Sequence, residues 1–219
     1  MVFFKLALLP FFANTPVPLF SRHRSTKARK PMKKRLVSLL LAFSMMLTFL
    51  PVGAMAATTI TQGNLKYTIN PDGKSVTVSG KKGSPTELTI ESSISDDNDI
   101  SYTVTKIADM VFASCSSLTQ VTIPSTVKEI GYQAFWGCSN LVKVTIPEGV
   151  TTIGQTAFTK CTQLTSITIP STITNMEWAF SGDPALSQVT LTNGIPRISS
   201  YAFSGCTSLT QVKIPATVD

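Results

Sequence analysis

The chain has 219 residues, 43% hydrophobic and 14% charged, a length that allows one or two domains. Its formal charge is +7, but nine of the nineteen basic residues lie between Lys5 and Arg35, where no acidic residue occurs. From Ala57 onward ten basic residues stand against twelve acidic ones, so this part lacks the basic surface that nucleic-acid binding requires.

The chain begins with two leader-like segments. Residues 1–31 hold an apolar stretch and a basic run ahead of Met32, and we interpret them as translated upstream sequence or an extended leader outside the fold. Residues 32–56 have the anatomy of a secretory signal peptide, with a basic start, an apolar run over 36–50 and small residues around the end.

This signal peptide is too short to be a membrane anchor. Its apolar run is fifteen residues long and rises only about 22 Å as a helix, against roughly 30 Å for the bilayer core. The small–x–small pattern at 54–56 predicts cleavage between Ala56 and Ala57. We therefore expect an exported protein that meets the membrane only through its leader.

Residues 57–105 are predicted to form an N-terminal β cap with one degenerate repeat. Two alternating segments, 65–69 and 75–78, flank Asn70-Pro71-Asp72-Gly73, which is strong turn chemistry for a hairpin. The degenerate repeat is visible at 88–94. The acidic run 96–99 that follows is either a solvated loop or a weak Ca²⁺ site, and it lacks the spacing of a dedicated calcium loop.

Residues 106–219 repeat with a period of about 23. Successive phenylalanines are 23, 23, 22 and 23 residues apart, and the single deletion falls between Met176 and Phe180. Leucine or a β-branched residue recurs at fixed offsets, and proline follows the strand-like segment in four of five copies. The aligned rows begin with Phe112, Phe135, Phe158, Phe180 and Phe203, and continue with Cys115, Cys138, Cys161, Asp183 and Cys206.

Each repeat is predicted to be one coil of a solenoid. Leu-x-x-Val-x-Ile is a short strand that proline ends, and Val-x-x-Ile forms a second wall. The Ala-Phe-x-x-Cys-x-x-Leu segment is expected to make about one helical turn. A single coil cannot bury its own apolar rows, so neighbouring coils must stack.

The motif from Ile153-Gly154 through Phe158, Cys161, Leu164 and Ile167 to Ile169-Pro170 resembles the BspA-like, Treponema-type leucine-rich repeat. The resemblance implies a strand-rich α/β, right-handed leucine-rich-repeat solenoid, here with an N-terminal β-hairpin cap. Such repeats occur on secreted and surface proteins of bacteria and some mucosal protists, and some members are implicated in adhesion. The chain departs from the pattern at Met176, Asp183 and Thr192.

Catalytic chemistry is not evident in the sequence, and we expect no enzyme, no metal and no cofactor. The only histidine, His23, lies in the leader. The chain after the leader therefore cannot form a Ser-His-Asp triad, a Cys-His pair or a histidine-ligated zinc site. The cysteine spacings of 23, 23 and 45 match no zinc motif. Buried free thiols are the favoured interpretation, with a disulfide left open by the export signal.

The candidate binding face consists of outward strand positions. One row stands between the two inward residues of each strand, and the other stands two positions earlier. Threonine in the first row is equally what a plain strand favours. An ice-binding array would need threonine in both rows, and it occurs in one. The residues are Thr122, Thr145, Thr168, Thr190 and Lys213 in the first row, and Gln120, Lys143, Gln188 and Gln211 with Ser166 in the second.

Four aromatic residues lie outside the core rows, namely Tyr132, Trp136, Trp178 and Tyr201. They are expected either to anchor an interface with a partner or to pack between neighbouring coils. The expected function is a secreted or cell-surface module that binds a protein, from host matrix or another cell surface, with glycan as a further ligand class. The alternative is a structural spacer that displays another domain. An enzyme with an unrecognised site is the third hypothesis.

Overall fold

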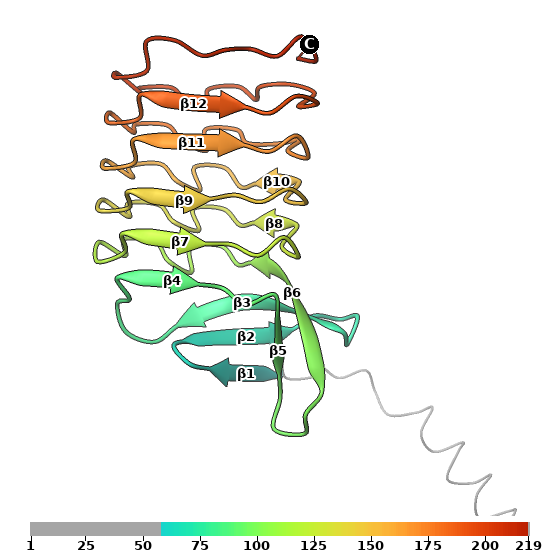
Figure 1. The fold of residues 1–219 in the computed structure, drawn as a ribbon. Coiled ribbons are helices and arrows are strands. Elements are labelled where there is room, and N and C mark those ends of the chain that lie inside the picture. The colour runs from blue at the N-terminus through green and yellow to red at the C-terminus, as the bar shows by residue number, and fades with distance from the viewer. Residues whose placement is uncertain (1–57, 219) are drawn as a thin grey trace, which may run out of the picture. The chain divides into compact units, whose positions relative to one another are not determined.

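A computed structural model describes residues 58–218, which contain twelve β-strands and no helix (Figure 1). The expected leader, signal peptide and cleavage point between Ala56 and Ala57 lie outside the described residues. No segment in the described range is a helix long and apolar enough to cross a membrane.

The N-terminal strands form an antiparallel unit that runs on into the repeats. Asp72 organises the hairpin turn, because its Oδ1 accepts hydrogen bonds from the backbone nitrogens of Lys74 and Ser75 at 2.9 Å. Antiparallel pairs join β1 to β2, β2 to β3 and β5 to β6, while β3 pairs with β6 in parallel. The strands are β1 (Thr59–Gln62), β2 (Leu65–Ile69), β3 (Ser75–Lys81), β5 (Ser93–Ser95) and β6 (Ser101–Ile107).

One wall of the stacked coils carries the longer parallel strands. Glu87 pairs with Gln120 and Gln120 with Lys143, so the degenerate repeat stands in register with the regular ones. Ser166 pairs with Gln188 in the same way further along. These strands are β4 (Glu87–Thr89), β7 (Gln120–Thr122), β9 (Lys143–Thr145), β11 (Ser166–Ile169) and β12 (Gln188–Leu191).

The second wall is formed by β6, β8 (Glu129–Ile130) and β10 (Thr152–Ile153), which pair in parallel. An isolated bridge from Thr152 to Asn175 extends it by one coil. Figure 1 shows this wall opposite β7 and β9, with one coil per rung. The predicted Val-x-x-Ile wall is therefore present.

The interior is filled by the predicted apolar rows. The five repeat phenylalanines form a continuous stack whose ring centroids are 5.1, 5.0, 5.3 and 5.6 Å apart, with planes within 14° of parallel. Phe112 to Phe180 are fully buried, as are Leu118, Leu141, Leu164 and Leu186. Each ring covers the next, so burial of any one depends on the coils on both sides.

The predicted helical turn is wrong, and the α component of the expected fold class is absent from the described residues. Two residues per coil have left-handed backbone, which no right-handed helix accommodates. The backbone nitrogens of the first four repeat phenylalanines instead donate to an alanine carbonyl of the next coil, as from Phe135 to Ala157 at 2.8 Å. The first left-handed position is two residues before the phenylalanine, at Met110, Gln133, Thr156, Trp178 and Tyr201.

The last coil departs from the predicted core as well. Ile214 belongs to an inward row, yet it is 57% exposed, and Phe203, Leu209 and Val212 are only partly buried. Within the described residues no further coil packs on this one, so its apolar rows lack the cover that the middle coils receive.

Candidate binding face

Eight residues of the two predicted rows lie on the outer side of β7, β9, β11 and β12, and Gln211 and Lys213 follow in the next coil, where Lys213 bridges Thr190 in parallel. We call this surface the strand face. Each side chain is positioned by strand alternation, because its neighbours along the strand point into the core. Gln120 is half-buried and all the others are exposed, namely Thr122, Lys143, Thr145, Ser166, Thr168, Gln188, Thr190, Gln211 and Lys213. The structure thus brings every predicted face residue to one surface.

The polar groups of the strand face have no intramolecular partners. Within residues 58–218, none of these side chains takes part in a side-chain hydrogen bond. Neither Lys143 nor Lys213 joins an ion pair in that range, where the pair recorded is Lys106 with Glu129. Their donors and acceptors therefore remain free to bind a ligand in place of water.

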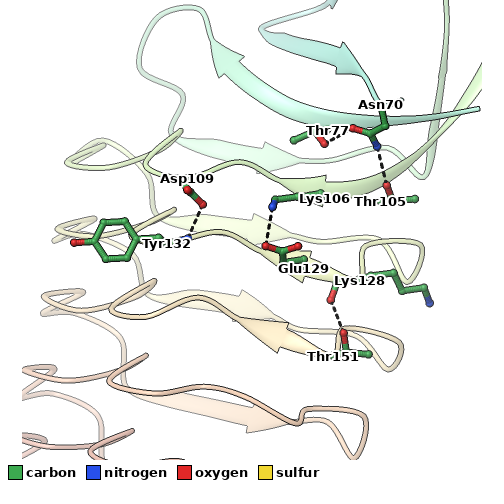
Figure 2. A network of polar contacts seen from close by, with 9 residues as sticks. All are labelled: Asn70, Thr77, Thr105, Lys106, Asp109, Lys128, Glu129, Tyr132 and Thr151. Atoms are coloured by element: carbon green, nitrogen blue, oxygen red, sulfur yellow. Dashed lines mark hydrogen bonds and ion pairs between the residues drawn. The ribbon is translucent and has the colours of Figure 1, made fainter. Parts of the chain in front are cut away.

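The second wall differs, because its polar groups bond to one another. Figure 2 shows the Lys106–Glu129 ion pair, with 2.7 Å between Nζ and Oε1. In the same view the backbone nitrogen of Tyr132 donates to Asp109, and Thr151 Oγ1 donates to the Lys128 carbonyl. Its polar chemistry is used to hold adjacent coils together.

The cysteines line the interior as free thiols. Cys115, Cys138, Cys161 and Cys206 are all buried. The Sγ of Cys138 donates to the Phe112 carbonyl at 3.2 Å, and Cys206 repeats this contact with Phe180 at 3.1 Å. Burial raises the pKa of the Cys138 thiol to about 12, so it stays protonated and able to donate.

Asp183 occupies the cysteine position of the fourth coil and is fully buried. Its Oδ1 accepts a hydrogen bond from the Cys161 backbone nitrogen at 2.8 Å, while its Oδ2 has no partner among the described residues. Burial raises its pKa to about 8. The sequence marked Asp183 as a departure from the repeat but gave no signal that one oxygen would be left without a partner.

The four aromatic residues outside the core divide between two environments. Tyr132 and Tyr201 are exposed, whereas Trp136 and Trp178 are half-buried. Trp178 stacks on Tyr201 with 4.2 Å between ring centroids, and the ammonium of Lys160 lies 4.9 Å from the Trp136 ring centroid. Trp136, Trp178 and Tyr201 thus contact a side chain of a neighbouring coil, and the two tyrosines are open to solvent.

The acidic loop is organised by its own backbone. Asp96 Oδ1 accepts hydrogen bonds from the backbone nitrogens of Asn98 and Ile100, and Oδ2 accepts one from the Tyr102 hydroxyl. These bonds lower the pKa of Asp96. The described range contains no group of three or more His, Cys, Asp or Glu side chains arranged to hold a metal ion.

Stacked coils with a parallel strand on one wall and a buried phenylalanine row define the class of leucine-rich-repeat proteins. Within that class the chain belongs to the BspA type leucine rich repeat region family, whose model matches in six copies over residues 91–210 and 176–219. No curated protein matches the sequence significantly.

Solved structures with this fold come from several bacteria. A leucine rich cell surface protein of Faecalibacterium prausnitzii is 32% identical, with a TM-score of 0.57 over 76% of this chain and 51% of that one. A leucine-rich repeat protein of Bacteroides capillosus is 29% identical, with a TM-score of 0.54 over 62% of this chain and 99% of that one. The Leucine Rich Repeat protein of T. pallidum, at 24% identity and a TM-score of 0.54 over 69% and 80%, shares the fold.

Proposed function

We propose that this chain is an exported, surface-associated binding module whose strand face contacts a protein partner. The observation that carries the proposal is the contrast between the walls: polar groups of the second wall bond to neighbouring coils, whereas the side chains of the strand face are unpaired within residues 58–218. A regular row of free donors and acceptors fits an extended segment that runs across successive coils.

The cellular setting follows from the leader and from a relative. The basic start and apolar run of residues 32–56 are those of a signal peptide, and the F. prausnitzii protein is described as a cell surface protein. The partner is then a host matrix protein or a protein on another cell, and the module serves adhesion. The same setting gives no reason to assign a catalytic role.

Two further features of the architecture belong to this proposal. We infer that β1, β2 and β3 cap the first coil, because Val76 and Val78 are fully buried and β3 continues the second wall through β6. We also infer right-handed winding of the coils from the BspA-type family. A capped first coil keeps the N-terminal end from pairing with other chains.

The proposal is tested with two matched pairs of threonines. Thr145 and Thr168 are exposed on the strand face, and Thr151 and Thr174 are exposed on the opposite side of the coils. The full chain, the T145R/T168R variant and the T151R/T174R variant are titrated by surface plasmon resonance over a panel of extracellular matrix proteins and over whole cells.

We expect the wild type and T151R/T174R to bind the same panel member, and T145R/T168R to bind it at least about ten-fold more weakly, a loss of 1.4 kcal/mol. Equal loss in both variants would place the contact elsewhere. Absence of binding to every protein and cell in the panel would favour the spacer role instead, while binding to glycan arrays alone would replace the protein partner with a carbohydrate.

A further inference from the structure

A cavity opens where the strand face meets the β1–β2 turn. Its volume is about 300 Å³, at the lower end of the range for small-ligand pockets. Residues 62–64 of the turn form one side of it, and β4, with Pro85 before it and Glu91 beyond it, forms the other. Leu65 and Leu88, which are both buried, give it an apolar wall.

Two carboxylates lie along one side of this cavity. Glu87 and Glu91 occupy alternate positions with Thr89 between them, so all three point to the same side of the extended chain. Both glutamates are exposed, and neither is in an ion pair within residues 58–218. No basic residue lines the cavity, while the side-chain amides of Gln62 and Asn64 add acceptor oxygens.

The hydroxyl of a buried tyrosine, which has no partner, faces the same space. Tyr67 lines the cavity and is only 2% exposed, and its hydroxyl makes no hydrogen bond with any described residue. Among the described residues, Asp183 Oδ2 is the side-chain polar atom that is both fully enclosed and without a partner. The Tyr67 hydroxyl also lacks a partner, so it is not fully enclosed and keeps some access to the cavity. Burial, and then the charge of Glu91, raise the pKa of Tyr67, so the phenol is neutral. Its oxygen can accept a hydrogen bond.

We propose that this cavity binds the guanidinium of an arginine side chain from the protein partner. Arginine combines an aliphatic stem, which suits the Leu65 and Leu88 wall, with five donors that suit separated acceptors. Glu87 and Glu91 are four residues apart, roughly 13 Å along an extended chain, so the guanidinium pairs with one carboxylate and the other adds negative charge beside it. The proposal rests on the proposed function, because it places one residue of a partner that crosses the strand face.

The probe that tests this inference is Nα-acetyl-arginine N-methylamide, titrated into the full ¹⁵N-labelled chain. The matched probe is the citrulline analogue, which has the same shape and no charge. We expect arginine to shift the amide signals of Gly63, Leu88 and Thr89, and citrulline to leave them in place. Equal shifts with both probes, or none with either, would overturn the proposal.

Three variants test whether arginine binds to the carboxylates of Glu87 and Glu91 and to the hydroxyl of Tyr67. The E87Q/E91Q variant should bind arginine about ten-fold more weakly, because charged hydrogen bonds are lost. The E148Q/E177Q variant removes two exposed glutamates elsewhere and should bind as the wild type does. Y67F removes a hydroxyl that has no partner, so we expect an unchanged unfolding midpoint and about three-fold weaker binding.

Wild-type binding by E87Q/E91Q, or equal loss in both double variants, would overturn the assignment. The two proposals fail separately. If the cavity binds no arginine but T145R/T168R still loses its panel ligand, the strand face stands and the arginine site falls. If arginine binds and T145R/T168R keeps its affinity for the panel ligand, the arginine site is supported and the role of the strand face is not.

Discussion

At the scale of single residues, Gly154 is required because adjacent coils approach each other closely at this corner. A Cβ on Gly154 would overlap the carbonyl carbon of Gly131 and lie 2.5 Å from the backbone nitrogen of Tyr132. Both obstacles are backbone atoms, so no side-chain rotation relieves the overlap. The Ile-Gly pair in the repeat thus marks a contact between coils rather than a turn.

We therefore predict that Gly154→Ala lowers the free energy of unfolding by about 2 kcal/mol or more. Gly80→Ala is the matched control, because a Cβ there meets only the flexible Lys66 side chain at 3.4 Å. It should change stability by less than about 0.5 kcal/mol. Urea unfolding followed by circular dichroism measures both, and equal stability of the two variants would contradict the close approach.

Asp183 predicts a specific pH dependence. The unfolded carboxyl titrates near pH 3.9, whereas the buried carboxyl of the folded chain has a pKa of about 8. Between these values the folded state binds a proton that the unfolded state has released, so stability falls as pH rises from about 4 to 8 and levels off above. The charged form loses stability because one oxygen has no donor to replace water.

Asp183→Asn should remove this slope, because the amide keeps an acceptor for the Cys161 nitrogen and carries no charge. At pH 8 we expect it to be more stable than the wild type by at least about 2 kcal/mol, and at pH 4 nearly equal. Urea unfolding of both proteins at the two pH values measures the difference. A wild type that gains stability relative to the variant between pH 4 and pH 8 would contradict the assignment.

At the scale of elements, the phenylalanine stack connects the coils. Phe158 lies between Phe135 and Phe180 with centroid distances of 5.0 and 5.3 Å and is fully buried. Phe203 has one ring neighbour in the described residues and is partly buried. The same residue type thus has different cover in a middle coil and in the last one.

Phe158→Ala should lower the free energy of unfolding by about 4 kcal/mol, because it leaves a cavity that neighbouring rings cannot fill. Phe203→Ala should cost less than half as much, since part of that ring already contacts water. Chemical denaturation of the two variants tests this comparison. Equal losses would mean that the rings contribute independently and that the stack does not couple the coils.

The strands were predictable and the corners were not. Alternation and period identify the inward rows, since a one-residue shift would expose every apolar side chain of a strand. The first left-handed corner position holds Met110, Gln133 and Trp178, types with no preference for positive φ, so this position carries no signal against a helix. Hydrogen bonds between coils, which a sequence window does not contain, decide the corner conformation.

For the candidate site, the sequence predicted which side chains point outward but not which of them are paired. Strand alternation alone places Thr145 and Lys143 outward. Whether an outward side chain is free or paired depends on residues one coil away, as with Lys106 and Glu129. The cavity beside β4 escaped the sequence analysis because Tyr67, on β2, and Glu91, in the segment after β4, meet only in the fold.

At the scale of the whole molecule, the stacking of the coils and the proposed recognition depend on one geometry. The spacing that keeps the phenylalanine rings about 5 Å apart also repeats the outward rows at each coil. The two walls use their polar groups differently. Those of the second wall connect neighbouring coils, and the side chains of the strand face are available for contact with a ligand. A partner with an extended segment can therefore contact several coils at once.

Site-specific photo-crosslinking tests this central claim most directly. A single benzoylphenylalanine replaces Thr145 on the strand face, or Thr151 on the opposite side, in the full chain bound to the panel member identified by surface plasmon resonance. We predict that irradiation joins the partner to the chain from position 145 and not from position 151. Crosslinking from position 151 alone, or equally from both, would contradict recognition by the strand face.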